Sequence, residues 1–130
     1  MVPQPRSADH QLTATDWLTT GGHLSLRVLS RGAGTLLVEV TGEVDLSTAR
    51  HLDAVLQDRV RGDLRELVLD LAGVTFFSVA GLNSLLRAQL LADSAGARLT
   101  VDAGRSRAVR RLFTLLPTEF DCVANVRPAP

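Results

Sequence analysis

The stretch "LVLDLAGVTFFSVAGLNSLL", residues 67–86, decides how this chain is expected to fold. It starts with a nearly continuous apolar run, which is typical of a strand that is covered on both faces of a sheet. A helix is predicted next, because Leu82, Leu85, Leu86 and Leu90 have the spacing i, i+3, i+4, i+8 that places apolar residues on one buried face of a helix. Strand and helix meet in "FFSVAGL", residues 76–82, a kind of junction where chemistry is often found. This junction is nearly without reactive groups, since only Ser78 carries a hydroxyl.

The segments around this stretch complete an alternating pattern of strands and helices. "HLSLRVLS" (23–30) and "TLLVEVTG" (35–42) each alternate apolar and polar residues across a Gly-rich turn, which predicts a β-hairpin. A helix that Asp45 or Ser47 caps is expected next. Later segments predict a short strand in "RLTVDA", a helix in "SRAVRRLFTLL" and a last short strand in "EFDCV".

This order predicts one α/β domain. A hairpin followed by parallel crossovers indicates a small mixed sheet of about four to five strands, flanked by about three to four helices. We assign residues 23–124 to this domain, 1–22 to a flexible N-terminal tail and 125–130 to a C-terminal tail. Trp17, within the N-terminal tail, stands out as an apolar residue whose role the sequence leaves open.

Composition narrows the classes of function. The 130 residues include no lysine, and the formal net charge is zero. Without lysine, the phosphate-binding Gly-Lys-Ser/Thr loop and Schiff-base chemistry are excluded, and zero net charge argues against a nucleic-acid partner. The single cysteine, Cys122, cannot form an internal disulfide and is expected in the core. No apolar run is long enough to span a membrane, so we expect a soluble, cytoplasmic protein.

No pattern of residues indicates an enzyme. Ser78 lacks the flanking glycines of a G-x-S-x-G nucleophile elbow. His10, His23 and His51 do not have the spacing of metal ligands, so we expect no metal, no cofactor and no catalytic residue. The segment "RSRAVRR", residues 105–111, has four arginines. A cluster of this kind is usually the solvated face of a helix, although it is also suited to receive an acidic partner.

Three segments together resemble a known family. "VEVTGEVDLSTARHLDAVL" (38–56), "ELVLDLAGVTFFSVAGLNSLL" (66–86) and "AVRRLFTLL" (108–116) are similar to the STAS domain of bacterial anti-sigma-factor antagonists. The resemblance covers residues 24–123 and implies the STAS fold. It also implies a partner, an anti-sigma factor that is a serine protein kinase, and through it a role in sigma-dependent transcription and the stress response.

The junction departs from the family pattern. Members that resemble this chain usually read Phe-Ile-Asp-Ser-Ser-Gly-Leu there, and the partner kinase phosphorylates the second serine. In this chain Ser78 stands at the Asp position, Val79 at the first serine and Ala80 at the phospho-acceptor. Because Ala80 has no hydroxyl, the phospho-switch of the family cannot operate at this position.

The resemblance also implies which residues contact the partner. They come from the loop before the first helix and from the start of the second: Glu43, Asp45, Ser78, Val79, Ala80, Gly81, Leu82 and Asn83. Asp45 can serve as helix cap, as partner contact or as both. A displaced phospho-acceptor would be Ser78 or Ser84, although a cap or a helix-face serine is the commoner role.

Several interpretations of function stay open at this stage. The first is a constitutive antagonist that binds an anti-sigma factor and does not respond to its kinase at Ala80. The second is a non-switching STAS scaffold or subunit of a larger signalling or transporter assembly. The third is a sensor of a small anion or nucleotide, because the end of a sheet beside helix N-termini is able to bind an anion. The sequence does not indicate the oligomeric state.

Overall fold

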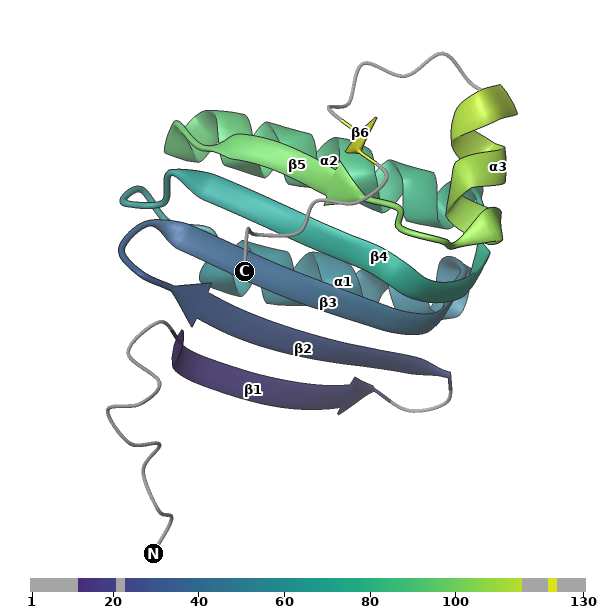
Figure 1. Cartoon of the computed structure of the whole chain (residues 1–130), viewed down its shortest axis with the longest axis horizontal. Coiled ribbons are helices and arrows are strands. Elements are labelled where there is room, and N and C mark those ends of the chain that lie inside the picture. Colours follow the sequence, from purple (N-terminus) through teal and green to yellow (C-terminus); the bar gives the residue numbers. More distant parts are fainter. Residues whose placement is uncertain (1–11, 21–22, 116–121, 124–130) are drawn as a thin grey trace, which may run out of the picture.

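The computed structural model describes residues 12–20, 23–115 and 122–123, which form one sheet and the helices packed against it (Figure 1). In chain order the elements are β1 (Leu12–Thr20), β2 (Leu24–Arg31), β3 (Thr35–Val44), α1 (Leu46–Arg59), β4 (Glu66–Phe77), α2 (Val79–Ala95), β5 (Arg98–Asp102), α3 (Arg107–Leu115) and β6 (Cys122–Val123). In Figure 1, α1 and α2 lie behind the sheet, whereas α3 lies past the end of β5 and beside the end of β4.

The order of strands in the sheet follows their order in the chain. β1, β2 and β3 pair antiparallel, and β3, β4, β5 and β6 pair parallel. Helix α1 connects β3 to β4, and α2 connects β4 to β5. The predicted α/β fold, a hairpin followed by parallel crossovers, is therefore confirmed, and the sheet has six strands because β1 adds to the five that the sequence pattern indicates.

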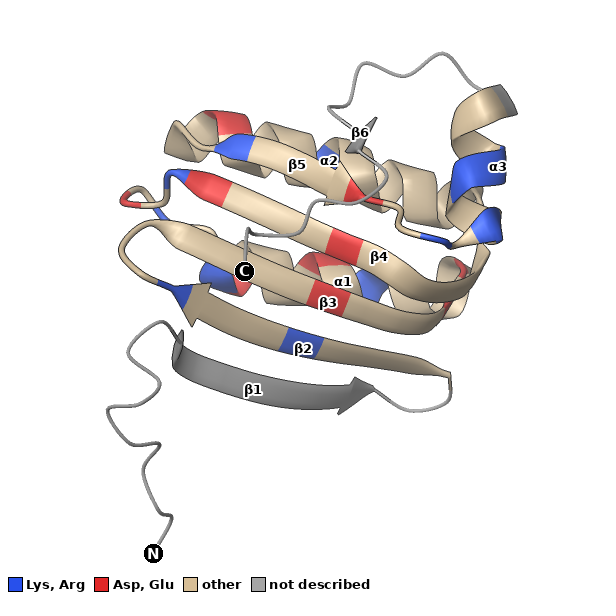
Figure 2. Ribbon diagram, viewed as in Figure 1, with Lys and Arg blue, Asp and Glu red and all other residues tan. Residues whose placement is uncertain are grey.

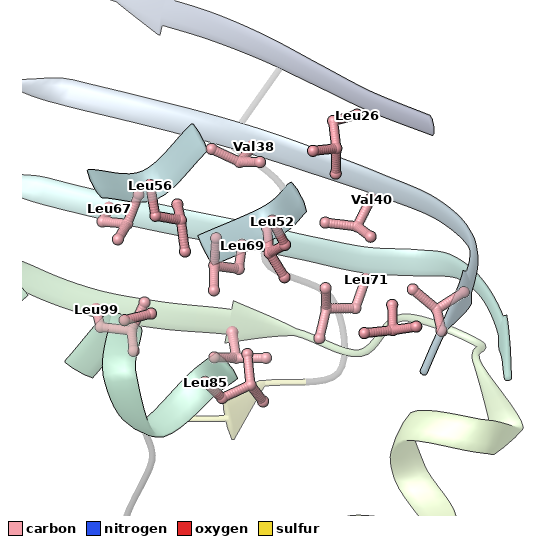
Figure 3. Close-up of a cluster of buried hydrophobic side chains, with 14 of the residues drawn as sticks. Leu26, Val38, Val40, Leu52, Leu56, Leu67, Leu69, Leu71, Leu85 and Leu99 are labelled. Carbon is pink, nitrogen blue, oxygen red and sulfur yellow. The ribbon is translucent and has the colours of Figure 1, made fainter. Parts of the chain in front are cut away.

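Alternate residues of the central strands supply the core. The most deeply buried side chains include Leu24, Leu26, Val28, Val38, Val40, Leu67, Leu69 and Leu71 from the sheet. Figure 3 shows Leu52 and Leu56 of α1 and Leu85 of α2 gathered against them. Each fully buried leucine stabilises the fold by roughly 1.5–3 kcal/mol relative to an exposed one. In this sheet β4 lies between β3 and β5, and α1 and α2 cover the same side, so the position where β4 ends is well determined.

Part of the expected N-terminal tail is a strand. Residues 12–20 form β1, which pairs with β2 over nearly its whole length, from Leu12 opposite Arg31 to Thr20 opposite Leu24. The prediction of a tail over residues 1–22 is wrong for this part; residues 1–11 and 21–22 lie outside the described residues, as do 124–130. The physical reason is the open edge of β2, whose backbone N–H and C=O groups need partners.

The inner side of α2 differs from the predicted leucine stripe. Its buried residues are Gly81, Ser84, Leu85, Ala88 and Ala92. Leu86 is 50% exposed and Leu90 is 65% exposed, so the prediction that both face inward is wrong. The small buried side chains let the backbone of α2 come close to α1 and to the sheet, and leucines at those positions would hold it away.

Candidate functional site

The junction lies at the edge of the sheet where β3 and β4 both end. In their parallel register Glu43 is opposite Phe76, and Val44 is opposite Phe77. The backbone N–H of Ser78 then donates a hydrogen bond of 3.0 Å to the carbonyl of Val44. Because both strands stop at the same level, α1 and α2 begin next to each other. The structure thus brings together the two segments in which partner contacts are predicted.

Gly42 sets the path of the chain into this edge. Its φ is +105°, a value that residues with a Cβ atom rarely adopt. A Cβ atom at this position would also overlap the carbonyl oxygen of His23. The same carbonyl oxygen accepts a hydrogen bond of 2.9 Å from the backbone N–H of Glu43. The close approach of β2 and β3 at this point therefore requires glycine, and it fixes where the loop before α1 starts.

Asp45 caps α1 through a dense set of hydrogen bonds. Its Oδ1 accepts from the Ser47 hydroxyl at 2.8 Å, the Ser47 backbone N–H at 2.9 Å and the Thr48 backbone N–H at 3.0 Å. Thr48 Oγ1 accepts from the Asp45 backbone N–H at 2.9 Å and donates to the Glu43 carbonyl at 2.8 Å. These bonds, first of all the one from the Ser47 hydroxyl, lower the pKa of Asp45 below its ordinary 3.8. Of the two predicted caps, Asp45 is the one used, while its contact with a partner stays a prediction.

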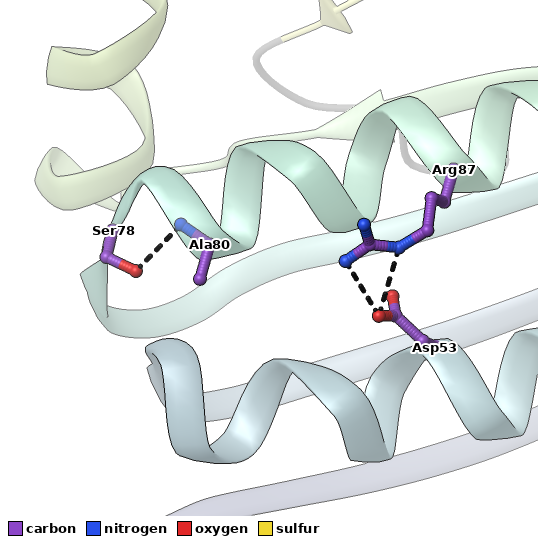
Figure 4. A network of polar contacts seen from close by, with 4 residues as sticks. All are labelled: Asp53, Ser78, Ala80 and Arg87. Carbon is purple, nitrogen blue, oxygen red and sulfur yellow. Dashed lines mark hydrogen bonds and ion pairs between the residues drawn. The ribbon is translucent and has the colours of Figure 1, made fainter.

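Ser78 caps α2 in the same way. Its backbone is extended, and its Oγ accepts a hydrogen bond of 3.1 Å from the backbone N–H of Ala80 (Figure 4). Serine therefore keeps the cap at the position where the resemblance expects aspartate. Ala80 is partly buried and packs against the core, so only part of its methyl group reaches the surface.

Apolar side chains are exposed where β4 ends and where α1 and α2 begin. Leu46 and Val79, the first residues of α1 and α2, are 84% and 63% exposed. Phe76, at the end of β4, is 51% exposed. We call Leu46, Val79 and Ala80 the junction surface. Single exposed apolar residues are ordinary, but apolar residues exposed at the starts of two neighbouring helices are suited to contact a protein partner.

The remaining predicted partner residues divide by exposure. Glu43, Ser78 and Leu82 are partly exposed, and Asn83 is exposed. Gly81 is buried, and a Cβ atom there would lie 2.6 Å from the ring of Phe77, so Gly81 lies beneath the surface that a partner would touch. Sequence reasoning missed Leu46. The available signal was that this apolar residue, at the start of α1, is out of phase with the buried residues Leu52 and Leu56.

Ser84 is excluded as a displaced phospho-acceptor in the folded chain. Its exposure is 0%, so a kinase cannot reach its hydroxyl. Within the part of the chain that the structure describes, Ser84 Oγ has no hydrogen-bond partner. An unpaired hydroxyl in a core costs free energy, which means that this serine does not contribute to stability through its oxygen.

An ion pair links α1 to α2 about two helical turns beyond their starts. Arg87 donates from Nη2 and Nε to Asp53 Oδ2, at 2.9 Å and 3.1 Å (Figure 4). Both donors converge on one carboxylate oxygen, and an ion pair with an arginine as exposed as this one contributes at most about 1 kcal/mol. The ion pair adds a polar contact to the packing of α1 beside α2.

Residues 12–20, 23–115 and 122–123 include no group of three or more His, Cys, Asp or Glu that is placed to hold a metal ion. The helices of the same ranges include none with the length and apolar character needed to cross a membrane.

Comparison with known families identifies the fold family. The family model described as "Mlab, STAS domain" matches residues 28–118, well over half of the chain. This chain belongs to the STAS family. The resemblance drawn from the sequence is thereby confirmed. No curated protein matches this STAS sequence.

Solved STAS structures agree with this assignment. An anti-sigma factor antagonist from Mycobacterium paratuberculosis has a TM-score of 0.67 and 26% identity, over 84% of this chain and 92% of that one. Two further structures share the fold. The STAS domain of an antisigma-factor antagonist from Rhodobacter sphaeroides has a TM-score of 0.57 and 16% identity, over 65% of this chain and 90% of that one. The anti-sigma factor antagonist SpoIIAA in its unphosphorylated form has a TM-score of 0.60 and 14% identity, over 78% of this chain and 89% of that one.

Proposed function

We propose that this STAS protein is an anti-sigma-factor antagonist that binds an anti-sigma factor of the serine kinase type through the junction surface. It acts by binding alone, without catalysis, and in this way influences sigma-dependent transcription in the bacterial cytoplasm, including transcription in the stress response. The similarity to an anti-sigma factor antagonist over 84% of the chain supports this class of partner.

The observation that carries the proposal is the apolar junction surface. Leu46, 84% exposed, begins α1, and Val79, 63% exposed, begins α2 directly before Ala80. A partner that covers them gains from removing apolar area from water. A small anion or nucleotide would gain little from these two side chains, which is why we favour a protein partner at this surface.

The same surface supports binding that phosphorylation does not switch off. A phosphoserine carries about −1.5 to −2 charges at neutral pH, and an apolar contact that buries it would be strongly weakened. Ala80 keeps the uncharged state permanently, because it has no hydroxyl to modify. Ser78 has a hydroxyl, but its oxygen already accepts the N–H of Ala80 as a helix cap. The chain therefore holds its partner regardless of kinase activity.

The test compares substitutions at Ala80 with a matched control. Ala33 is exposed in the β2–β3 turn, at the opposite end of the sheet, so Ala33→Asp introduces the same charge away from the site. Each variant is used as bait in a pull-down from the host, and the affinity for the retained anti-sigma factor is then measured by calorimetry. We expect wild type, Ala80→Ser and Ala33→Asp to retain the factor, and Ala80→Asp to lose it.

The kinase reaction provides a second readout on the same partner. With ATP, the retained anti-sigma factor should phosphorylate Ala80→Ser but not wild type, and phosphorylation should release the variant. Phosphate on Ser78 of wild type would show that a displaced switch exists. If no anti-sigma factor is retained, and all variants hold the same unrelated assembly, the protein is a non-switching STAS subunit and the antagonist role is wrong.

A further inference from the structure

Helix α3 concentrates positive charge at one end of the molecule. Residues 103–114 contain four arginines, Arg105, Arg107, Arg110 and Arg111, and no acidic residue. All four are exposed, and Figure 2 shows the positive colour gathered on α3 and the loop before it. The formal net charge of the whole chain is zero, so this is a local excess and not a general property of the surface.

The helix itself is not stabilised by this arrangement. Arg107 lies in the first turn of α3, where the positive end of the helix dipole repels a cation, and this turn has no acidic residue. Arg107 and Arg111 are also four residues apart, a spacing at which like charges repel each other. Among the described residues neither forms an ion pair, while Arg110 donates from Nε to the carbonyl of Gly104 at 2.7 Å. Charges that oppose local stability are expected where a surface serves binding.

A cleft runs between these arginines and the end of β4. It has a volume of about 820 Å³. Its lining combines Thr75, Phe76 and Phe77 of β4 with Arg107, Ala108, Arg110, Arg111 and Thr114 of α3. No acidic side chain is among them. Phe76 is 51% exposed, so an aromatic ring is accessible beside several guanidinium groups.

We propose that this cleft binds an acidic segment of a protein, with an apolar side chain against Phe76 and carboxylates on Arg107 and Arg111. The planar guanidinium matches a carboxylate with two parallel hydrogen bonds. The positive region is confined to one short helix, whereas a nucleic acid needs a basic surface that follows its backbone. The apolar side of α3 packs against the core through Val109, Leu112 and Phe113, so it is not available to insert into a membrane surface. This proposal does not depend on the anti-sigma factor or on the junction surface.

The test uses a labelled peptide and single charge reversals. The probe is a fluorescein-labelled peptide of about ten residues, made of glutamate and aspartate around one phenylalanine, titrated in fluorescence anisotropy. Arg107→Glu is compared with Arg61→Glu, which reverses an exposed arginine in the loop between α1 and β4. We expect Arg107→Glu to weaken binding at least about fivefold and Arg61→Glu to leave it within about twofold. Added salt should weaken binding to wild type, because the contacts are exposed ion pairs.

Thermal unfolding separates a binding role from a structural one. Arg107→Glu places a carboxylate in the first turn of α3 and creates a Glu–Arg pair with Arg111, so its Tm should equal or exceed that of wild type. A variant that is as stable as wild type and binds the peptide more weakly supports the proposal. Equal affinity of Arg107→Glu and wild type overturns it.

Two further arms test the choice of partner. A peptide in which alanine replaces the phenylalanine should bind more weakly, because the contact with Phe76 is lost. Tighter binding of a single-stranded oligonucleotide, or of phosphatidylserine vesicles, than of the acidic peptide overturns the proposal in favour of those ligands. Ala80→Asp should leave peptide binding unchanged, so a failure of this site and a failure of the proposed function are distinguishable.

Discussion

Replacing Gly42 by alanine tests how the junction is positioned. The φ of +105° costs a residue with a side chain about 1–3 kcal/mol. In addition, the new Cβ would overlap the carbonyl oxygen of His23, so β2 and β3 must separate and the Glu43 N–H···O hydrogen bond of 2.9 Å is lost. That loss adds about 1 kcal/mol, and the shift of packed strands adds about 1 kcal/mol more. We expect Gly42→Ala to lower the free energy of unfolding by about 3–5 kcal/mol.

Gly32→Ala is the matched control. Gly32 also has a positive φ, +59°, but a Cβ there would meet nothing within 4 Å. Its cost is therefore the backbone term alone, about 1–2 kcal/mol. Urea unfolding followed by circular dichroism gives both values, and in a domain of 130 residues each kcal/mol lowers the Tm by about 4 °C. Equal losses of stability in the two variants would show that the contact with His23 is not what requires glycine.

Three further predictions, with four substitutions, are tested by urea unfolding. Asp45→Asn keeps a capping oxygen and removes the charge. Because the pKa of Asp45 in the folded chain lies below 3.8, the charge stabilises the fold fully above pH 3.8, and this contribution disappears as the pH falls through the folded pKa. The difference in stability between the variant and wild type should therefore shrink below pH 3.8, and a difference that does not change with pH contradicts the cap assignment. Ser84→Ala removes a buried, unpaired hydroxyl and should raise stability by up to about 1 kcal/mol, whereas a loss would reveal a partner for that oxygen. Leu90→Gln should change stability by less than about 0.5 kcal/mol, while Leu85→Gln, in the core, should cost about 3 kcal/mol or more; similar values would contradict the observed faces of α2.

The predictable part of the fold comes from local pattern. Period-two alternation in β2 and β3 and the continuous apolar run of β4 are visible in the sequence. The caps Asp45 and Ser78 are predictable too, because the chemistry that caps a helix depends on one or two residues at its start. These elements place the candidate site, since a parallel pair of strands carries both helix starts to one edge.

The remaining features depend on distant parts of the chain. β1 is a strand because the edge of β2 is available to it, and the segment from Thr13 to Thr20 shows only the β propensity of its threonines and Trp17. In α2 the helical period is correct, but the side that faces inward is decided by how closely the helix approaches α1 and the sheet. A spacing rule that counts only large residues selects Leu86 and Leu90 over Ala88 and Ala92.

The uncovered leucines of α2 bear on how the chain behaves without a partner. Leu86 and Leu90 are at least half exposed, on the same helix as Val79. Because the formal net charge at pH 7 is zero, copies of the chain do not repel one another at that pH. Apolar exposure and zero net charge both favour self-association, so the solubility of the free chain should be lowest near neutral pH. A partner that covers this side of α2 would then keep the protein in solution, and the amount of partner would limit how much free protein accumulates.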